Sequence, residues 1–215
     1  MVVGISGGKD SVGLLYLLWW QRRLRGAPFE ILPVHIADTG RDLAEFDPLI
    51  RWAETLGLRL ITVHTDLRPH SAAGLSPCFS CAWNRKKALF ETAERLGSSV
   101  VALGHHSDDV VTTALMNLFF QGRFDGILPR LSYFGGTFRL IRPLYFVSEH
   151  ALMKLAREEA LPLIPTTCEF ADRSKRALAR SWLDMIMRDQ PSAKRSLLGA
   201  LHRQALATCA ENGTR

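Results

Sequence analysis

The chain has 215 residues, of which 47% are hydrophobic, and a formal net charge of +6. That is enough for one sizeable α/β core, and no Pro/Ser-rich linker, internal repeat or low-complexity tract divides it. The apolar run Leu14–Trp20 is far shorter than the ~20 residues that span a bilayer. We therefore expect a cytoplasmic protein with no signal peptide and no membrane association.

Apolar runs alternate with helical patterns along the chain. The predicted strands are Val2–Ile5, Ile31–Ala37, Leu58–His64, Ser99–Gly104 and Phe138–Leu144. The predicted helices are Ser11–Arg25, Leu43–Leu56, Cys81–Leu96, Ser107–Gln121 and Ser148–Ala160. This alternation predicts an α/β fold with a Rossmann-like parallel sheet and helices on both faces. We place one domain at residues 1–165 and a basic helical tail at 166–215.

A glycine-bearing turn lies between the first predicted strand and the first predicted helix, with the sequence Ser6-Gly7-Gly8-Lys9-Asp10-Ser11. Glycines let the backbone approach an anion closely, and a helix start directs N–H groups and the positive dipole end at it. Lys9 adds a positive charge and the serines add hydroxyl donors, while Asp10 is placed to hold Mg²⁺ against phosphates. The spacing differs from that of the Walker A loop.

Two further motifs follow strand ends, where ligands collect in such sheets. Asp38 follows the second strand and either contacts a nucleotide or forms a turn, and His35 within that strand is expected in the core. Gly104-His105-His106-Ser107-Asp108-Asp109 ends the fourth strand and opens a helix. At least one of Ser107, Asp108 and Asp109 should cap that helix, and a dedicated transition-metal site there is disfavoured.

Four cysteines in an intracellular α/β protein suggest metal or redox chemistry. Cys78 and Cys81 form a C-x-x-C motif at a helix entry, where the helix dipole favours thiolates. By itself the motif fits half a zinc site, a redox dithiol or two packed thiols. Cys168 lies downstream, and Cys209 is expected to be incidental. We expect Phe79 and Trp83, beside the motif, to pack in the core, with stacking of RNA bases as the alternative.

Basic residues concentrate in the last third of the chain, which favours a phosphate-binding surface over two solvated amphipathic helices. They are Arg173, Lys175, Arg176, Arg180, Arg188, Lys194, Arg195 and Arg203.

The glycine turn resembles the SGGKDS-type loop of the PP-loop ATP pyrophosphatases, and the Gly-His-His-x-Asp-Asp stretch resembles that of their tRNA 2-thiocytidine synthetase group. The resemblance covers Val2 to about Asp189, and no N-terminal extension is expected. It implies an adenine nucleotide alpha hydrolase-like fold and an ATP site. The implied nucleotide-binding residues are Ser6, Gly7, Gly8, Lys9, Asp10, Ser11, Asp38, Gly104 and His105. Asp10, His105 and Asp109 become catalytic candidates, with Asp10 on Mg²⁺ and His105 a possible general acid or base.

The same resemblance implies a [4Fe-4S] cluster held by Cys78, Cys81 and Cys168. Threonines precede Cys168 where the group usually has Ile-Pro-Cys-x-x-Cys. Three thiolates leave one iron open to hydrosulfide.

The function implied by the resemblance is thiolation of tRNA. ATP would adenylate the C2 carbonyl oxygen of a cytidine, and sulfur from a cysteine desulfurase or free sulfide would displace AMP. The family often dimerises. Thiolation of a small molecule or another base is the first alternative, and a non-catalytic metal-binding module is the second.

Overall fold

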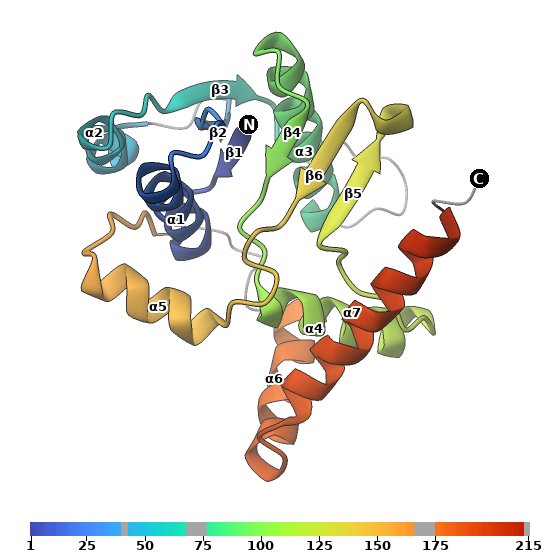
Figure 1. The fold of residues 1–215 in the computed structure, drawn as a ribbon. Helices are drawn as coiled ribbons and strands as arrows, with labels where there is room; N and C mark the ends of the chain where they lie inside the picture. The colour runs from blue at the N-terminus through green and yellow to red at the C-terminus, as the bar shows by residue number, and fades with distance from the viewer. Residues whose placement is uncertain (40–42, 68–76, 166–174, 213–215) are drawn as a thin grey trace. The chain divides into compact units, whose positions relative to one another are not determined.

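The computed structural model describes residues 1–39, 43–67, 77–165 and 175–212, with side chains except at 77–78 and 207–212. Six strands form one sheet in the order β3-β2-β1-β4-β6-β5 (Figure 1). The strands are β1 (Val2–Ile5), β2 (Leu32–Asp38), β3 (Ile61–Thr65), β4 (Val100–Ala102), β5 (Arg130–Tyr133) and β6 (Phe138–Ile141). Neighbours run parallel except β5, which pairs antiparallel with β6.

Helices connect the parallel strands, as the alternating pattern predicts. They are α1 (Lys9–Arg25), α2 (Asp47–Thr55), α3 (Pro77–Arg95), α4 (Ser107–Gln121), α5 (Glu149–Glu158), α6 (Lys175–Asp189) and α7 (Ala193–Asn212), with short 3-10 turns η1 (Ala44–Phe46) and η2 (Phe134–Gly136). Glycine ends two of them in the left-handed region, because Gly26 after α1 has φ +58° and Gly122 after α4 has φ +64°. A residue without Cβ adopts this conformation at little cost.

The core forms where helices cover the continuous apolar strands. On one face of the sheet, Leu89 and Phe90 of α3 pack with Val2, Val34 and Leu140 from three strands. On the α1 side, Gly13 of α1 faces Leu152 and Leu155 of α5, at distances that would be ordinary contacts for an added Cβ, so α1 and α5 lie against one another here. The predicted α/β fold with a largely parallel sheet is confirmed.

The molecule divides into two compact units. Unit 1 contains residues 1–104, 130–143 and 150–167, including the sheet; unit 2 contains residues 105–129, 144–149 and 168–215. In unit 2, Ala179 and Leu183 of α6 pack with Val111 and Leu115 of α4, and α7 packs against the same cluster through Leu197 and Leu198. The division predicted at residue 165 stays a prediction. No helix in the described residues is long and apolar enough to cross a membrane.

Candidate functional site

The glycine loop, residues 6–11, connects the carboxyl end of β1 to the start of α1. Gly7 has φ +86°, and a Cβ there would lie 2.8 Å from Cβ of Ile164. The Ile164 N–H donates to the Gly7 carbonyl at 2.9 Å, so a residue after α5 fixes this turn. Glycine is therefore required at position 7 by both the backbone conformation and the space.

Gly8 is the N-cap residue of α1, with φ −75° and ψ 159°. Among the described residues, no side chain caps this helix start. A Cβ at Gly8 would meet only Ser6 Oγ, at 3.6 Å. The first N–H groups of a helix lack partners within the helix and carry its positive dipole end. The position thus offers an anion close backbone approach.

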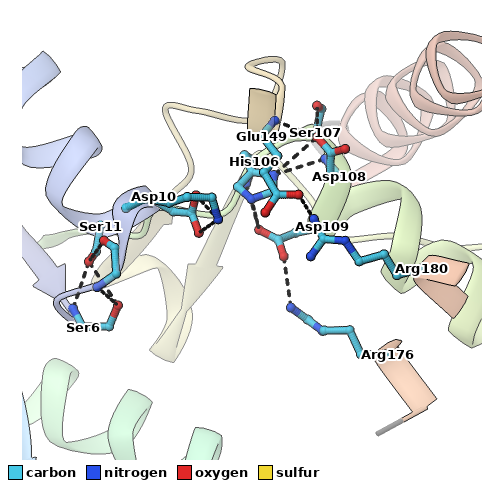
Figure 2. A network of polar contacts seen from close by, with 12 residues as sticks. Ser6, Asp10, Ser11, His106, Ser107, Asp108, Asp109, Glu149, Arg176 and Arg180 are labelled. Carbon is cyan, nitrogen blue, oxygen red and sulfur yellow. Dashed lines mark hydrogen bonds and ion pairs between the residues drawn. The ribbon is translucent and has the colours of Figure 1, made fainter. Parts of the chain in front are cut away.

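Two hydroxyls hold the loop in shape (Figure 2). Ser6 Oγ and Ser11 Oγ lie 3.0 Å apart, Ser11 Oγ donates to the Gly8 carbonyl at 3.0 Å, and it accepts from the Ser6 N–H at 3.1 Å. Lys9 Nζ forms an ion pair with Asp10 at 3.2 Å. The Ser11 hydroxyl, which was predicted to donate to a phosphate, here makes hydrogen bonds within the loop and supports its shape.

Two neighbouring strand ends complete the surroundings of the loop within unit 1. Asp38 Oδ1 accepts from the Leu67 N–H at 2.9 Å, which ties the end of β2 to the segment after β3. This is the turn-forming role that the sequence left open. Gly104 follows β4, and a Cβ there would lie 2.7 Å from the Asp10 carbonyl oxygen. His35 is buried against Phe46, with ring centroids 3.9 Å apart, so its predicted place in the core is confirmed.

Unit 2 contains a second polar group, the carboxylate cluster of His106, Asp108 and Asp109 at the start of α4 (Figure 2). His106 is only 3% exposed and is the N-cap residue. Its Nδ1 accepts from the Asp108 N–H at 3.3 Å, and Asp109 Oδ2 accepts from the His106 N–H at 3.1 Å. The prediction that at least one of Ser107, Asp108 and Asp109 caps this helix is confirmed by Asp109, which closes the capping box, while His106 is the N-cap residue itself.

Cations from α6 and α7 pair with this cluster. Lys194 Nζ lies 2.8 Å from Asp108 Oδ1, and Arg176 Nη1 lies 3.0 Å from Asp109 Oδ1. The Glu149 N–H also donates to Asp108, and the Glu149 carboxylate pairs with Arg180. Three of the basic residues expected on a phosphate-binding surface therefore bind carboxylates of their own unit.

The pKa of Asp108 is lowered by these contacts. Burial by itself would raise the pKa of this carboxyl, but the His106 imidazole, Lys194 and the Ser107 hydroxyl stabilise the carboxylate and outweigh burial. Asp108 is therefore an anion at neutral pH. His105, the other predicted catalytic residue of this segment, is partly buried at the junction between β4 and α4.

The cysteine motif lies in the first turns of α3, as predicted. Cys81 is a partly buried thiol that is not in a disulfide, and it packs against the core under α3. The Cys78 side chain and all of Cys168 lie outside what the structure describes. Within the described residues, no three His, Cys, Asp or Glu side chains form a group that could hold a metal ion.

The expectation that Phe79 and Trp83 pack in the core is wrong. Phe79 is 54% exposed and Trp83 is 55% exposed. Both belong to the surface of α3 because the buried side of that helix is supplied by Ala88, Leu89 and Ala93.

Two positioning residues were missed from sequence. Ile164 is separated from the glycine loop by most of the chain, and no local pattern signals its contact with Gly7. No capping role was predicted for His106, although an aspartate three residues later fits a capping-box pattern.

The chain is similar in sequence and in structure to several known proteins. The PP-loop domain model matches residues 1–183. The tRNA-cytidine(32) 2-sulfurtransferase of Geobacter sulfurreducens is 34% identical over 94% of this chain and 80% of its own length, and that of Geobacter metallireducens is 32% identical over 94% and 80%. The structure of the U34-tRNA thiolase NcsA from Methanococcus maripaludis with its [4Fe-4S] cluster aligns with TM-score 0.75 at 21% identity, covering 95% of this chain and 71% of that one. At that identity the likeness supports the fold.

Proposed function

Because the chain belongs to the PP-loop family and, within it, to the tRNA-cytidine(32) 2-sulfurtransferases, we propose that it thiolates a cytidine of tRNA in an ATP-dependent reaction. The products are 2-thiocytidine, AMP and pyrophosphate. The observation that carries the proposal is the glycine loop, in which Gly8 leaves the start of α1 open to an anion. The relatives' names supply the substrate class.

In the first step the loop binds the phosphates of ATP. Backbone N–H groups at the start of α1 and the ammonium of Lys9 bind the β- and γ-phosphates, and Asp10 holds Mg²⁺. The O2 atom of the base attacks the α-phosphorus, an O–P bond forms, and the bond to pyrophosphate breaks. The loop contributes by holding the phosphates in place and by offsetting charge that develops on the leaving group.

In the second step sulfur adds at C2 of the adenylated base and AMP leaves with the former carbonyl oxygen. Adenylation is needed because a base carbonyl oxygen is a poor leaving group. The sulfur adds at the oxidation level of hydrosulfide. Free sulfide supplies it directly, and the persulfide of a cysteine desulfurase supplies it after a thiol has reduced the S–S bond. We assign His105 and Asp109 to proton transfer and to orientation of the reacting groups, and Asp38 to the nucleotide side of the site.

Cys81 fits the role of a cluster ligand, because it is a thiol near the start of α3 and does not form a disulfide. We assign Cys78, Cys81 and Cys168 to a [4Fe-4S] cluster. When bound, it supplies an iron without a protein ligand that can take hydrosulfide. The dipole of α3 lowers the cost of holding thiolates at this helix start.

The test uses tRNA from a strain that lacks this gene and carries the wild-type, Gly8→Ala, Cys78→Ala or Cys81→Ala chain. Nucleosides are quantified by mass spectrometry. We expect 2-thiocytidine only with the wild type and with the matched control Cys209→Ala, which changes a cysteine outside the proposed cluster set.

A thionucleoside profile that does not change on gene deletion would overturn the tRNA assignment and favour thiolation of a small molecule. If Cys78→Ala and Cys81→Ala both restore 2-thiocytidine, the assigned cluster ligands are wrong while the tRNA assignment stands.

A further inference from the structure

A pocket of about 510 Å³ lies in unit 1 and is lined by residues of α3 and of the hairpin of β5 and β6. The proposed reaction uses none of the residues that line it. Its volume lies within the range of pockets that hold small organic ligands. Its lining includes the side chains of Trp83, Lys86, Phe90, Tyr133, Phe134 and Phe138.

The floor of the pocket is fixed and its rim is exposed. Phe90 is 6% exposed and packs against Tyr133 at 4.9 Å and Phe138 at 5.5 Å between ring centroids. Trp83 and Phe134 stand at the rim, and Phe134 is 68% exposed. Large aromatic rings held by a packed floor, with their own surface open to water, form a platform for another flat ring.

The turn that carries Phe134 is held in an uncommon conformation. Phe134 has φ +53°, a region that costs a residue with Cβ about 1–2 kcal/mol. The Thr137 hydroxyl donates to the Phe134 carbonyl at 2.8 Å and fixes the turn. The local conformation thus keeps an exposed aromatic side chain at the pocket, which is a common property of ligand-binding positions.

A cation lies over the rings. Lys86 Nζ is 4.9 Å from the centroid of Trp83 and 5.4 Å from that of Tyr133. Lys87, also at the pocket, forms an ion pair with Glu91. Lys86 and Lys87 lie nearer the cysteine end of α3, whereas the carboxylates at the pocket, Glu91 and Glu94, lie nearer its other end. Aromatic faces combined with a lysine match a nucleobase and its phosphate better than they match an apolar peptide.

We propose that this pocket holds an unstacked nucleobase of the RNA substrate, away from the base that is modified. The proposal rests on the proposed function. Residues 79, 83, 86 and 90 follow one another at spacings of three or four along α3 and so share a side of the helix. Phe79 lies between the two cysteines of the motif, about 10 Å along the helix from Lys86. One RNA loop can therefore contact both the pocket and the cysteine end of α3.

The test measures the affinity of the cluster-loaded protein for unmodified tRNA at several salt concentrations. We expect Trp83→Ala and Phe134→Ala each to weaken binding roughly tenfold, since base stacking on an aromatic ring contributes on this scale. Trp83→Phe should restore most of the affinity. Lys86→Ala should reduce the slope of log K against log salt by about 0.7, the amount for one phosphate contact, while Trp83→Ala leaves the slope unchanged.

Trp20→Ala is the matched control, because Trp20 is 44% exposed on α1 and belongs neither to the pocket nor to the proposed site. Thermal unfolding checks that each variant folds. Wild-type affinity and salt slope in Trp83→Ala, Phe134→Ala and Lys86→Ala would overturn the pocket proposal, while thiolation by the wild type would uphold the function.

A wild type that neither binds nor thiolates tRNA would overturn both the pocket proposal and the proposed function. Variants that change only the oligomeric state, measured by sedimentation, would assign the pocket to contact between copies and likewise overturn the proposal.

Discussion

Gly7 and Gly8 are neighbours that tolerate a side chain very differently. We predict that Gly7→Ala destabilises the protein by at least about 2 kcal/mol, because a methyl would force both a left-handed alanine and a clash with Ile164. Gly8→Ala should leave the melting temperature unchanged, since its φ suits any residue and space is open, but it should weaken ATP binding by occupying the approach of the phosphate. Thermal unfolding and calorimetric ATP titration measure the two effects. Equal melting temperatures for the two variants would contradict the prediction that only position 7 requires glycine for stability.

The lowered pKa of Asp108 predicts a pH-dependent contribution to stability. A carboxyl whose pKa is depressed by folding contributes above its unfolded pKa, about 3.9, and loses that contribution as pH falls toward the folded pKa. Asp108→Asn should therefore lower the free energy of unfolding by about 2 kcal/mol at pH 7, and the difference from wild type should shrink below about pH 4.

Urea denaturation at pH 7 and at pH 3 measures this difference. Asp184→Asn is the control, because Asp184 is exposed on α6 and no contact comparable to those of Asp108 is seen for it in the described residues. A difference between wild type and Asp108→Asn that is the same at both pH values would show that the carboxylate charge is not the cause.

At the scale of single residues, the sequence predicted the loop and the core histidine but not the partners of the charged groups. The local sequence pattern alone identifies Gly7 and Gly8 as part of a turn between a strand and a helix. The pairing of Asp108 with Lys194 joins residues from two distant helices, and only packing of α7 on α4 brings them together. Counting the basic residues of the tail therefore overstated how many are available to bind RNA phosphates, because several pair with carboxylates of the protein.

At the scale of elements, the central strands β1 and β2 were predictable because they are apolar runs that are largely buried on both faces. The antiparallel edge strand β5 was missed. Its sequence Arg130-Leu131-Ser132-Tyr133 alternates in burial and has too little apolar content to signal a buried strand. α3 begins at Pro77, before the predicted start, because proline is well suited to the first position of a helix.

The docking of α6 onto α4 depends on a small apolar core. Leu183 is 2% exposed and packs with Val111, Leu115 and Ala179. We predict that Leu183→Ala lowers the free energy of unfolding by about 2–4 kcal/mol through loss of buried surface and a cavity. Leu178→Ala, on the exposed side of the same helix, should cost less than about 1 kcal/mol. Hydrogen exchange should show faster exchange in α4 and α6 for Leu183→Ala, and equal protection in both variants would contradict the role of this core.

At the scale of the whole molecule, the net charge is +6, but part of the positive charge on α6 and α7 is paired with carboxylates of the protein. Arg188 and Arg195 are exposed on α6 and α7. We predict that the double variant Arg188→Glu, Arg195→Glu weakens tRNA binding on the order of tenfold and reduces its salt dependence. Arg51→Glu, an exposed control on α2, changes net charge by half as much and should have little effect. Binding isotherms for tRNA at three salt concentrations test this prediction. An equal loss of affinity in the double variant and in Arg51→Glu would indicate only a general effect of net charge.

The contact between Ile164 and Gly7 has a consequence for synthesis of the protein. The glycine loop leaves the ribosome among the first residues of the chain, but Ile164, whose backbone N–H fixes its turn, is made only after β6 and α5. A nascent chain that ends before residue 164 carries the whole ATP-binding motif without this support. We therefore expect competence to bind nucleotide to arise late in translation, when all six strands of the sheet have already been synthesised.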